Sequence, residues 1–296
     1  MALGFANWFQ IVLYTLLLTY CGVGNGVREM SKQNLQQEKG EKNILLVRHS
    51  KDEEDMEAPL IPKIGYFTMK DVYVGKRMSI DFPNRDFSSS PHLLPREEAD
   101  SIPFSSKELP NLLRLFSFSQ GSAQAKAVEE TIRFCELDTF KAKGETMLCA
   151  TSLESMLDFV RGAFGLEAPF KVITTTHFPS TKQKQKQKQN YTILEEPEEI
   201  STSNMVACHP MPYPYAVFFC HSHSHSHSHT NTSKVFKIVV GGEDGNRVEA
   251  VAVCHMDTSH WNHNSFRQLG FRPGTSPVCH FFSASNLIWV SSRPTH

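Results

Sequence analysis

The second half of the chain consists of short apolar runs that are typical of β-strands. The runs are rich in β-branched and aromatic residues and are bounded by Gly, Pro, Asn and Ser. Two of them, at 235–240 and 247–255, are separated by GGEDGN and predict a hairpin. The runs that we assign as strands are KVITTT, AVFFCH, KVFKIVV, RVEAVAVCH, VCHFF and LIWVSS.

The first half of the chain shows the apolar repeat of helices instead. Two segments with capping-box spacing, Ser105-x-x-Glu108 and Thr151-x-x-Glu154, precede apolar stripes, and a third stripe runs through 120–134. Such stripes indicate core packing rather than ligand sites. A helical first half and a strand-rich second half predict an α+β fold, with a helical N-terminal part packed on a largely antiparallel β C-terminal part.

Two low-complexity stretches interrupt the strands. KQKQKQKQ at 182–189 predicts a solvated basic loop. HSHSHSHSH at 221–229 places histidines at alternate positions and would bind transition metals if it were ordered. We favour an unstructured insertion at 222–229, because nothing in this stretch can form a core.

The N-terminus has the composition of a secretory signal. An apolar run from 11 to 18 is followed by the small residues Gly22, Gly24 and Gly26, which predicts a signal peptide at 1–24. An uncleaved anchor is the alternative, but the run is short for about 30 Å of hydrocarbon. The next residues, 25–65, are polar and predict a flexible leader, so the folded domain is expected to span 66–292.

Composition and charge exclude some classes of binding partner. The chain has 296 residues, of which 40% are hydrophobic, so it can bury a sizeable core. Thirty basic residues stand against 31 acidic ones, for a formal net charge of -1. This balance provides no global field for nucleic acid or an anionic membrane, and we expect neither as a partner once the signal is removed.

Seven cysteines are present, and Cys21 would leave with the signal. An even number then remains in an oxidising compartment, which predicts three disulfides stabilising the β part. Fifteen pairings of the six are allowed, and the sequence does not choose among them. The sequons at Asn190 and Asn231 are candidate glycosylation sites. The disulfide candidates are Cys135, Cys149, Cys208, Cys220, Cys254 and Cys279.

Four of these cysteines are each followed directly by a histidine. Consecutive side chains of a strand point to opposite faces, so each dipeptide would send its sulfur one way and its imidazole the other. Zinc bound through sulfur is disfavoured, because thiolates rarely stay reduced outside the cytosol and zinc-finger ligand pairs are spaced differently. The imidazoles suit copper or zinc, and purely structural histidines are an equal alternative.

Two other chemical interpretations carry less weight. Asp257 and His260 flank hydroxyl residues as in a hydrolase, but a catalytic triad is assembled from separated positions. Either residue would instead suit the orientation of a metal-bound imidazole. A matrix-binding module with an aromatic polysaccharide surface is a third function, although aromatic stripes are more often core. Its candidate members are Tyr213, Tyr215, Phe218 and Trp261.

The four dipeptides and their surroundings resemble the plant BURP-domain family, whose hallmark is four Cys-His pairs. Ten residues separate the first two pairs, 32 the second and third, and 23 the last two. Removing 222–229 shortens the middle gap to 24, which fits the family and marks this stretch as an insertion. The resemblance covers about 66–292, and its short leader is most similar to the seed-protein and embryo-associated branches. Further matching segments are LLPREEADSIPFSS, CATSLESMLDF, YPYAVFFCH, AVAVCHMDTSHWN and PVCHFF.

The resemblance implies a secreted plant protein of the apoplast, cell wall or storage vacuole, acting in development or stress response. Some family members are copper-dependent cyclases that crosslink an aromatic side chain to the backbone of a peptide in the same chain. Residues 27–65 contain no Trp or Tyr, so a peptide substrate would belong to another chain, and a noncatalytic descendant is the alternative. No residue is assigned to catalysis. The resemblance implies copper as the cofactor and the metal ligands His209, His221, His255 and His280.

Overall fold

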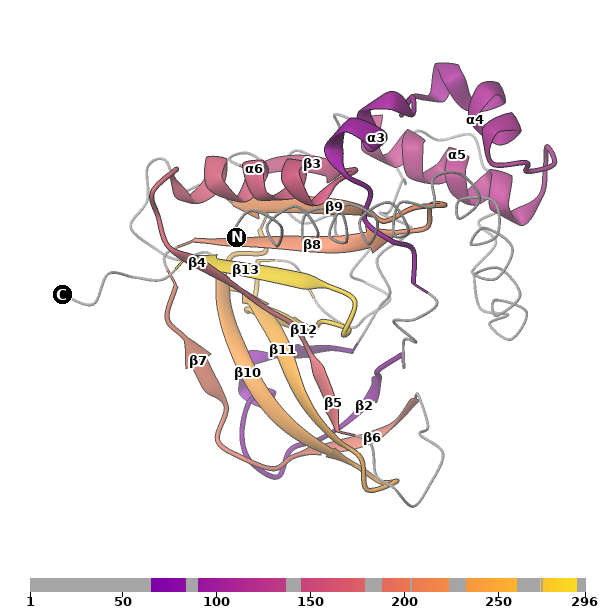
Figure 1. Cartoon of the computed structure of the whole chain (residues 1–296). Helices are drawn as coiled ribbons and strands as arrows, with labels where there is room; N and C mark the ends of the chain where they lie inside the picture. The colour runs from indigo at the N-terminus through magenta and orange to yellow at the C-terminus, as the bar shows by residue number, and fades with distance from the viewer. Residues whose placement is uncertain are drawn as a thin grey trace, which may run out of the picture.

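Two antiparallel β-sheets form the centre of the protein in a computed structural model (Figure 1). The structure describes residues 65–83, 90–136, 145–178, 188–202, 204–223, 233–259, 272 and 274–291. The larger sheet has the order β1-β12-β11-β10-β6-β2, with β5 beside β11 and β7 beside β10. Its strands are β1 (Tyr66–Thr68), β2 (Arg77–Asp81), β5 (Thr176–Phe178), β6 (Lys188–Ile193), β7 (Glu198–Ile200), β10 (Ser233–Gly242), β11 (Arg247–His255) and β12 (Val278–Phe281).

The smaller sheet has the order β3-β9-β8-β13-β4. The chain passes directly between the two sheets where β4 leads to β5 and where β12 leads to β13. Its strands are β3 (Glu145–Ala150), β4 (Phe170–Ile173), β8 (Met205–Met211), β9 (Val217–His223) and β13 (Leu287–Ser291).

Three apolar layers hold the sheets together. Side chains of β8 and β13 meet those of β10 and β11 between the sheets, in a cluster that includes Ala207, Val253 and Phe282. Behind the larger sheet, a second cluster is built around Phe82 and Tyr191. Behind the smaller sheet, a third cluster packs against α6. Each sheet is therefore buried on both faces in the region of the Cys-His dipeptides.

The helices lie on the smaller sheet and at one end of it. Figure 1 shows α6 along the outer face of β3, β9 and β8, and α3, α4 and α5 grouped together beside it. None of the helices in the described ranges is long and apolar enough to cross a membrane. The helices are η2 (Met69–Asp71), α3 (Arg96–Ser101), η4 (Ser106–Glu108), α4 (Leu109–Leu115), α5 (Ala123–Glu136) and α6 (Leu153–Phe164).

At one predicted helix start the capping residues differ from the prediction, and at the other the predicted cap is followed by a 3-10 turn. The Ser152 side chain caps α6 and forms a capping box with Ser155, instead of the expected pair Thr151 and Glu154. At the other start, the Ser105 side chain accepts from the Lys107 N–H and caps a 3-10 turn ahead of α4. A serine one residue closer to the first apolar position is the better cap in α6, because its hydroxyl reaches the third backbone N–H.

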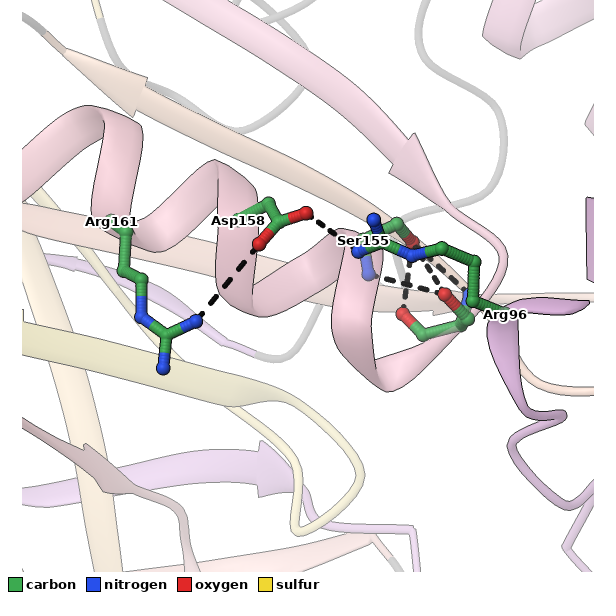
Figure 2. Close-up of polar contacts among 5 residues, drawn as sticks. Arg96, Ser155, Asp158 and Arg161 are labelled. Carbon is green, nitrogen blue, oxygen red and sulfur yellow. Dashed lines mark hydrogen bonds and ion pairs between the residues drawn. The ribbon is translucent and has the colours of Figure 1, made fainter. Parts of the chain in front are cut away.

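An exposed ion pair links the first helix to α6. Arg96 of α3 lies 2.6 Å from a carboxylate oxygen of Asp158, and Arg161 approaches the other oxygen at 3.9 Å (Figure 2). Ser155, which forms the capping box with Ser152, lies beside Arg96 in the same view. Such exposed pairs contribute about 0 to 1 kcal/mol, so we regard this one as a local tether and not as a functional site.

The structure confirms the α+β fold and the hairpin of β10 and β11. The run KVITTT divides into β4 and β5, because the Thr174 and Thr175 hydroxyls donate to carbonyls of the β12–β13 connection. Several strands were not predicted, among them β3, β6 and β8. Lys188 and Gln189, the end of the expected basic loop, belong to β6. The signal peptide, nearly all of the leader, and 224–229 of the histidine stretch lie outside the described residues.

Candidate metal centre

Two of the disulfides staple neighbouring strands at directly opposed positions. Cys208 of β8 faces Cys220 of β9, with Cα atoms 4.0 Å apart. Cys254 of β11 faces Cys279 of β12, with Cα atoms 3.9 Å apart. Directly opposed residues share a face of the sheet, so each bond fixes the register of its two strands.

The histidines that follow these cysteines lie diagonally across each strand pair. The Nε2 atoms of His209 and His221 are 3.3 Å apart, and so are those of His255 and His280. Ring centroids are 5.4 Å apart in both pairs, and the planes are inclined by 16° and 15°. The two strand pairs therefore present their imidazoles with the same geometry.

The sulfurs and imidazoles of the dipeptides point to opposite faces. Cys208 and Cys220 are buried in the cluster under α6, and the other disulfide is buried in the cluster behind the larger sheet. The imidazoles face the region between the sheets, where the Phe282 ring lies 5.5 Å from that of His209 and 4.7 Å from that of His280. Phe282 thus contacts one imidazole of each pair.

The four imidazoles do not form a single ligand set. Within the described residues, no group of three or more His, Cys, Asp or Glu side chains lies close enough to hold a metal ion. The imidazoles contact one another in two pairs, and charge interactions across the pairs, from His280 to His209 and from His221 to His280, also lower the pKa values of His209 and His280. Within each strand pair the imidazoles approach diagonally, and Phe282 contacts one imidazole of each pair.

A hydrogen bond from the residue that precedes β13 orients His209. Its Nδ1–H donates to Asn286 Oδ1 at 2.8 Å. The Asn286 amide is itself fixed, because its Nδ2 donates to Ser283 Oγ at 2.6 Å. With the proton on Nδ1, neutral His209 keeps its Nε2 lone pair directed toward His221.

The second pair is oriented by weaker contacts. His280 Nδ1 lies 3.4 Å from the Phe281 carbonyl, and His255 Nδ1 lies 3.5 Å from Ser233 Oγ. The carbonyl can only accept, so His280 also carries its proton on Nδ1 and presents a bare Nε2. The Tyr66 ring of β1 lies 5.6 Å from the ring of His280, whereas the aromatic neighbour of the first pair on its own sheet is Phe219.

Burial keeps two of these imidazoles neutral. Burial, followed by the nearby His221, lowers the pKa of His209 from 6.5 to about 3, although its bond to Asn286 acts in the opposite direction. Burial likewise lowers the pKa of His280 to about 4, against the effect of the Phe281 carbonyl. A metal ligand must be an unprotonated imidazole, so both side chains are in the ligating form at neutral pH.

A sequence model of the BURP domain matches residues 65–291, more than half of the chain. The chain belongs to the BURP-domain family. It is 41% identical over 230 residues to BURP domain protein USPL1 of Arabidopsis thaliana, covering 76% of this chain and 79% of that protein. It is 38% identical over 231 residues to BURP domain-containing protein BNM2A of Brassica napus, with the same coverage. BURP domain-containing protein 17 of Oryza sativa subsp. japonica is 41% identical over 229 residues, which are 38% of its length.

The histidine pairs of this BURP domain fit the dimensions of a shared metal ion. Two imidazole nitrogens that bind one ion at about 2.0 Å each lie about 2.8 to 3.4 Å apart, between right-angle and tetrahedral coordination. The observed separation of 3.3 Å lies within this range in both pairs. All the donors are imidazole nitrogens, a set that suits copper and zinc.

The remaining predicted residues of the BURP domain occupy different surroundings. Cys135 and Cys149 form the third disulfide, which joins α5 to β3, so all six cysteines are paired as expected. Tyr213 and Tyr215 are buried against α4 and form no exposed aromatic surface. Asp257 accepts from the Ser259 N–H, and His260, Trp261 and Asn231 lie outside the described residues. Asn190 lies in β6, where its Nδ2 donates to Glu243.

Several residues around the pairs were not anticipated from the BURP sequence. Asn286 orients His209 across 77 positions of sequence, and Phe282 contacts one imidazole of each pair. Tyr66 lies opposite His280 in the β1–β12 ladder. Only Phe282 had a signal in the sequence: it is two residues from His280, and i and i+2 share a face of a strand.

Proposed function

We propose that this BURP-domain protein is a secreted plant protein that binds one copper ion at each of its two histidine pairs. The spacing of 3.3 Å between facing Nε2 atoms, repeated in two different sheets, carries the proposal. Without metal, one imidazole of each pair can donate its Nε2–H to the bare Nε2 of the other, and the same spacing fits a shared ion that replaces this proton. Two ligands for each ion leave coordination positions open for water or a substrate.

The sequence also supports the proposed cellular setting. An N-terminal signal and paired cysteines are consistent with secretion to the cell wall or a storage compartment, where the protein would act in development or stress response. The matches to the Arabidopsis and Brassica relatives cover 76% of this chain and 79% of each relative, as expected for proteins that also have short leaders. This supports a place in the seed-protein or embryo-associated branch.

Copper stoichiometry tests the binding proposal. Untagged metal-free protein is loaded with Cu(II), dialysed and measured by elemental analysis. We expect about two coppers per chain, one after His209→Gln/His221→Gln or His255→Gln/His280→Gln, and none after all four changes. The control replaces His225, His227 and His229 with serine and should retain both ions. Copper that survives the quadruple change but disappears from the control would assign binding to the histidine stretch and refute the proposal.

A second function is oxidative peptide crosslinking, favoured by open coordination positions on imidazole-only sites. Bound copper would supply one-electron redox chemistry, while the protein residues hold the ligands neutral and orient them. An aromatic side chain and a peptide backbone each lose one hydrogen and are joined, and dioxygen takes both hydrogens to become hydrogen peroxide. Copper-loaded protein is incubated with Trp- or Tyr-containing peptides under air. A product lighter by two hydrogen atoms is expected; its absence with both ions bound and dioxygen present would exclude this activity for those peptides.

A further inference from the structure

The third disulfide differs from the two staples in its surroundings. Cys135–Cys149 joins the last turn of α5 to β3, whereas each staple joins two strands of one sheet. Cys135 and Cys149 are half-buried, while the four cysteines of the staples are 0% exposed. Thiol–disulfide exchange requires an attacking thiolate to reach a sulfur atom, so access alone favours attack at Cys135–Cys149.

This disulfide lies next to one histidine pair. Cys149 is directly opposite Phe219 in the β3–β9 ladder, so the two side chains share a face. The Phe134 ring, adjacent to Cys135 in sequence, packs edge-on at 4.8 Å from the Phe219 ring. Phe219 in turn stacks 5.5 Å from the ring of His221. The cross-link therefore holds the end of α5 against the wall of the His209–His221 pair.

Other contacts also hold α5 in place. The Thr131 hydroxyl donates to the Pro212 carbonyl at 2.9 Å, and a carboxylate oxygen of Glu136, the last residue of α5, accepts from Ser105 and Ser106 at 2.9 Å. Val128 and Ile132 are fully buried in the same apolar cluster. Loss of the cross-link would thus remove the covalent link between α5 and β3, while exposed hydrogen bonds alone retain the last residue of the helix and the buried face keeps the helix in the fold.

We propose that Cys135–Cys149 is a site of thiol–disulfide exchange with a dithiol, and that its reduction opens access to the His209–His221 pair. A dithiol thiolate attacks one sulfur and forms a mixed disulfide, and the other cysteine leaves as a thiolate. The second dithiol sulfur then closes a cyclic disulfide and releases the first cysteine. Two electrons pass from the dithiol to the protein disulfide. The His255–His280 pair, which has Tyr66 as its neighbour, is unaffected.

Graded reduction tests the first part of the proposal. Folded full-length protein is exposed to increasing dithiothreitol, the free thiols are alkylated, and each cysteine is quantified by mass spectrometry. Cys135 and Cys149 should be labelled at concentrations that leave the other four cysteines intact. Simultaneous reduction of all three disulfides, or earlier reduction of a staple, would overturn the assignment.

Access to the histidines tests the second part without metal. His221 and His280 are both half-buried and serve as a matched pair for labelling with diethyl pyrocarbonate. In Cys135→Ser/Cys149→Ser, His221 should be labelled about tenfold faster. The upper bound is the roughly hundredfold change in the folding equilibrium that opening a disulfide loop of this length allows. Labelling of His280 should not change. Equal labelling rates for His221 in the variant and the wild type would refute the proposal that this disulfide controls access to the His209–His221 pair. Should the variant fail to fold, native protein that has been selectively reduced and alkylated replaces it.

The consequence for metal exchange rests on the proposed function. Copper release to a chelator is followed in a His255→Gln/His280→Gln background, where only the first pair remains. Cys135 and Cys149 are both replaced by serine, so that no new thiol binds copper. Release should be about tenfold faster than with the disulfide intact. The reverse background, His209→Gln/His221→Gln, should show no change. If copper does not bind but His221 is still labelled faster, the proposed function is refuted and the control of access by Cys135–Cys149 is retained. If copper binds and its release is unchanged, the control of access by this disulfide is refuted.

Discussion

The β8–β9 and β11–β12 strand pairs reach the same histidine geometry in different sheets. Each has directly opposed cysteines and diagonal histidines, with Nε2 atoms 3.3 Å apart and ring centroids 5.4 Å apart. The sequence between the dipeptides differs, from a separation of 12 for one disulfide to 25 for the other. A Cys-His dipeptide on each of two antiparallel strands is therefore sufficient to define a pair, once the disulfide fixes the register.

The surroundings of the two pairs are different. His209 is 4% exposed and donates to a side-chain amide that the β12–β13 connection fixes in place. His280 is half-buried and relies on a 3.4 Å contact with the carbonyl of the next residue. The shared motif thus sets the spacing of the ligands, whereas the neighbouring residues determine how firmly each pair is held.

Removing a staple should have the largest effect. From chain entropy we expect Cys254→Ala/Cys279→Ala to lower the free energy of unfolding by about 3.5 kcal/mol and Cys208→Ala/Cys220→Ala by about 3 kcal/mol, because the first closes the longer loop. Urea unfolding measures both values. Each variant should also lose copper from its own pair only. Loss from both pairs in either variant would mean that they are not independent.

Acid should destabilise the metal-free protein through both pairs. The pKa values of His209 and His280 are lowered from 6.5 to about 3 and about 4, so below pH 6.5 the unfolded chain binds protons that the folded chain does not. Stability is therefore complete above pH 6.5 and decreases as the pH falls, by about 1.4 kcal/mol per pH unit for each histidine. The decrease from His280 ends near pH 4 and that from His209 near pH 3.

Single substitutions separate these two contributions. Urea midpoints are measured from pH 7 to pH 3 for the metal-free wild type, His209→Gln and His280→Gln. Each variant should have a shallower dependence on pH than the wild type, and the two variants should diverge below about pH 4, where the contribution of His280 has ended and that of His209 continues. Parallel curves for all three proteins would show that neither histidine is buried in its neutral form.

The sequence predicted much of this arrangement because strand alternation is a local property. AVFFCH and RVEAVAVCH alternate clearly, so the opposite directions of sulfur and imidazole followed from the period of two. The three disulfides followed from an even number of cysteines. Strand β6 was not predicted, because alternating Lys and Gln in its first residues conceal that Gln189 is buried and bonded to Tyr191.

The division into two pairs was not predictable, because it depends on which strands are neighbours. Fifteen cysteine pairings fit the sequence, and the observed pairing of β8 with β9 and of β11 with β12 decides which histidines lie together. The contact of Asn286 with His209 was not predictable either, because it depends on how the chain passes from one sheet to the other after β12. No local pattern encodes a contact over 77 residues.

Asn286 offers the finest test of the difference between the pairs. Asn286→Ala removes the acceptor of the His209 Nδ1–H and frees the ring to rotate, so we expect copper at the first pair to bind about tenfold more weakly. Ser285→Ala is the comparison variant, because Ser285 bonds to Ser283 in the same turn and reaches His209 only through Ser283 and Asn286. Copper affinity is measured by competition with a chelator in the His255→Gln/His280→Gln background. An equal loss in both variants would attribute the effect to the turn as a whole, whereas a loss confined to Asn286→Ala would show that this hydrogen bond distinguishes the first pair from the second.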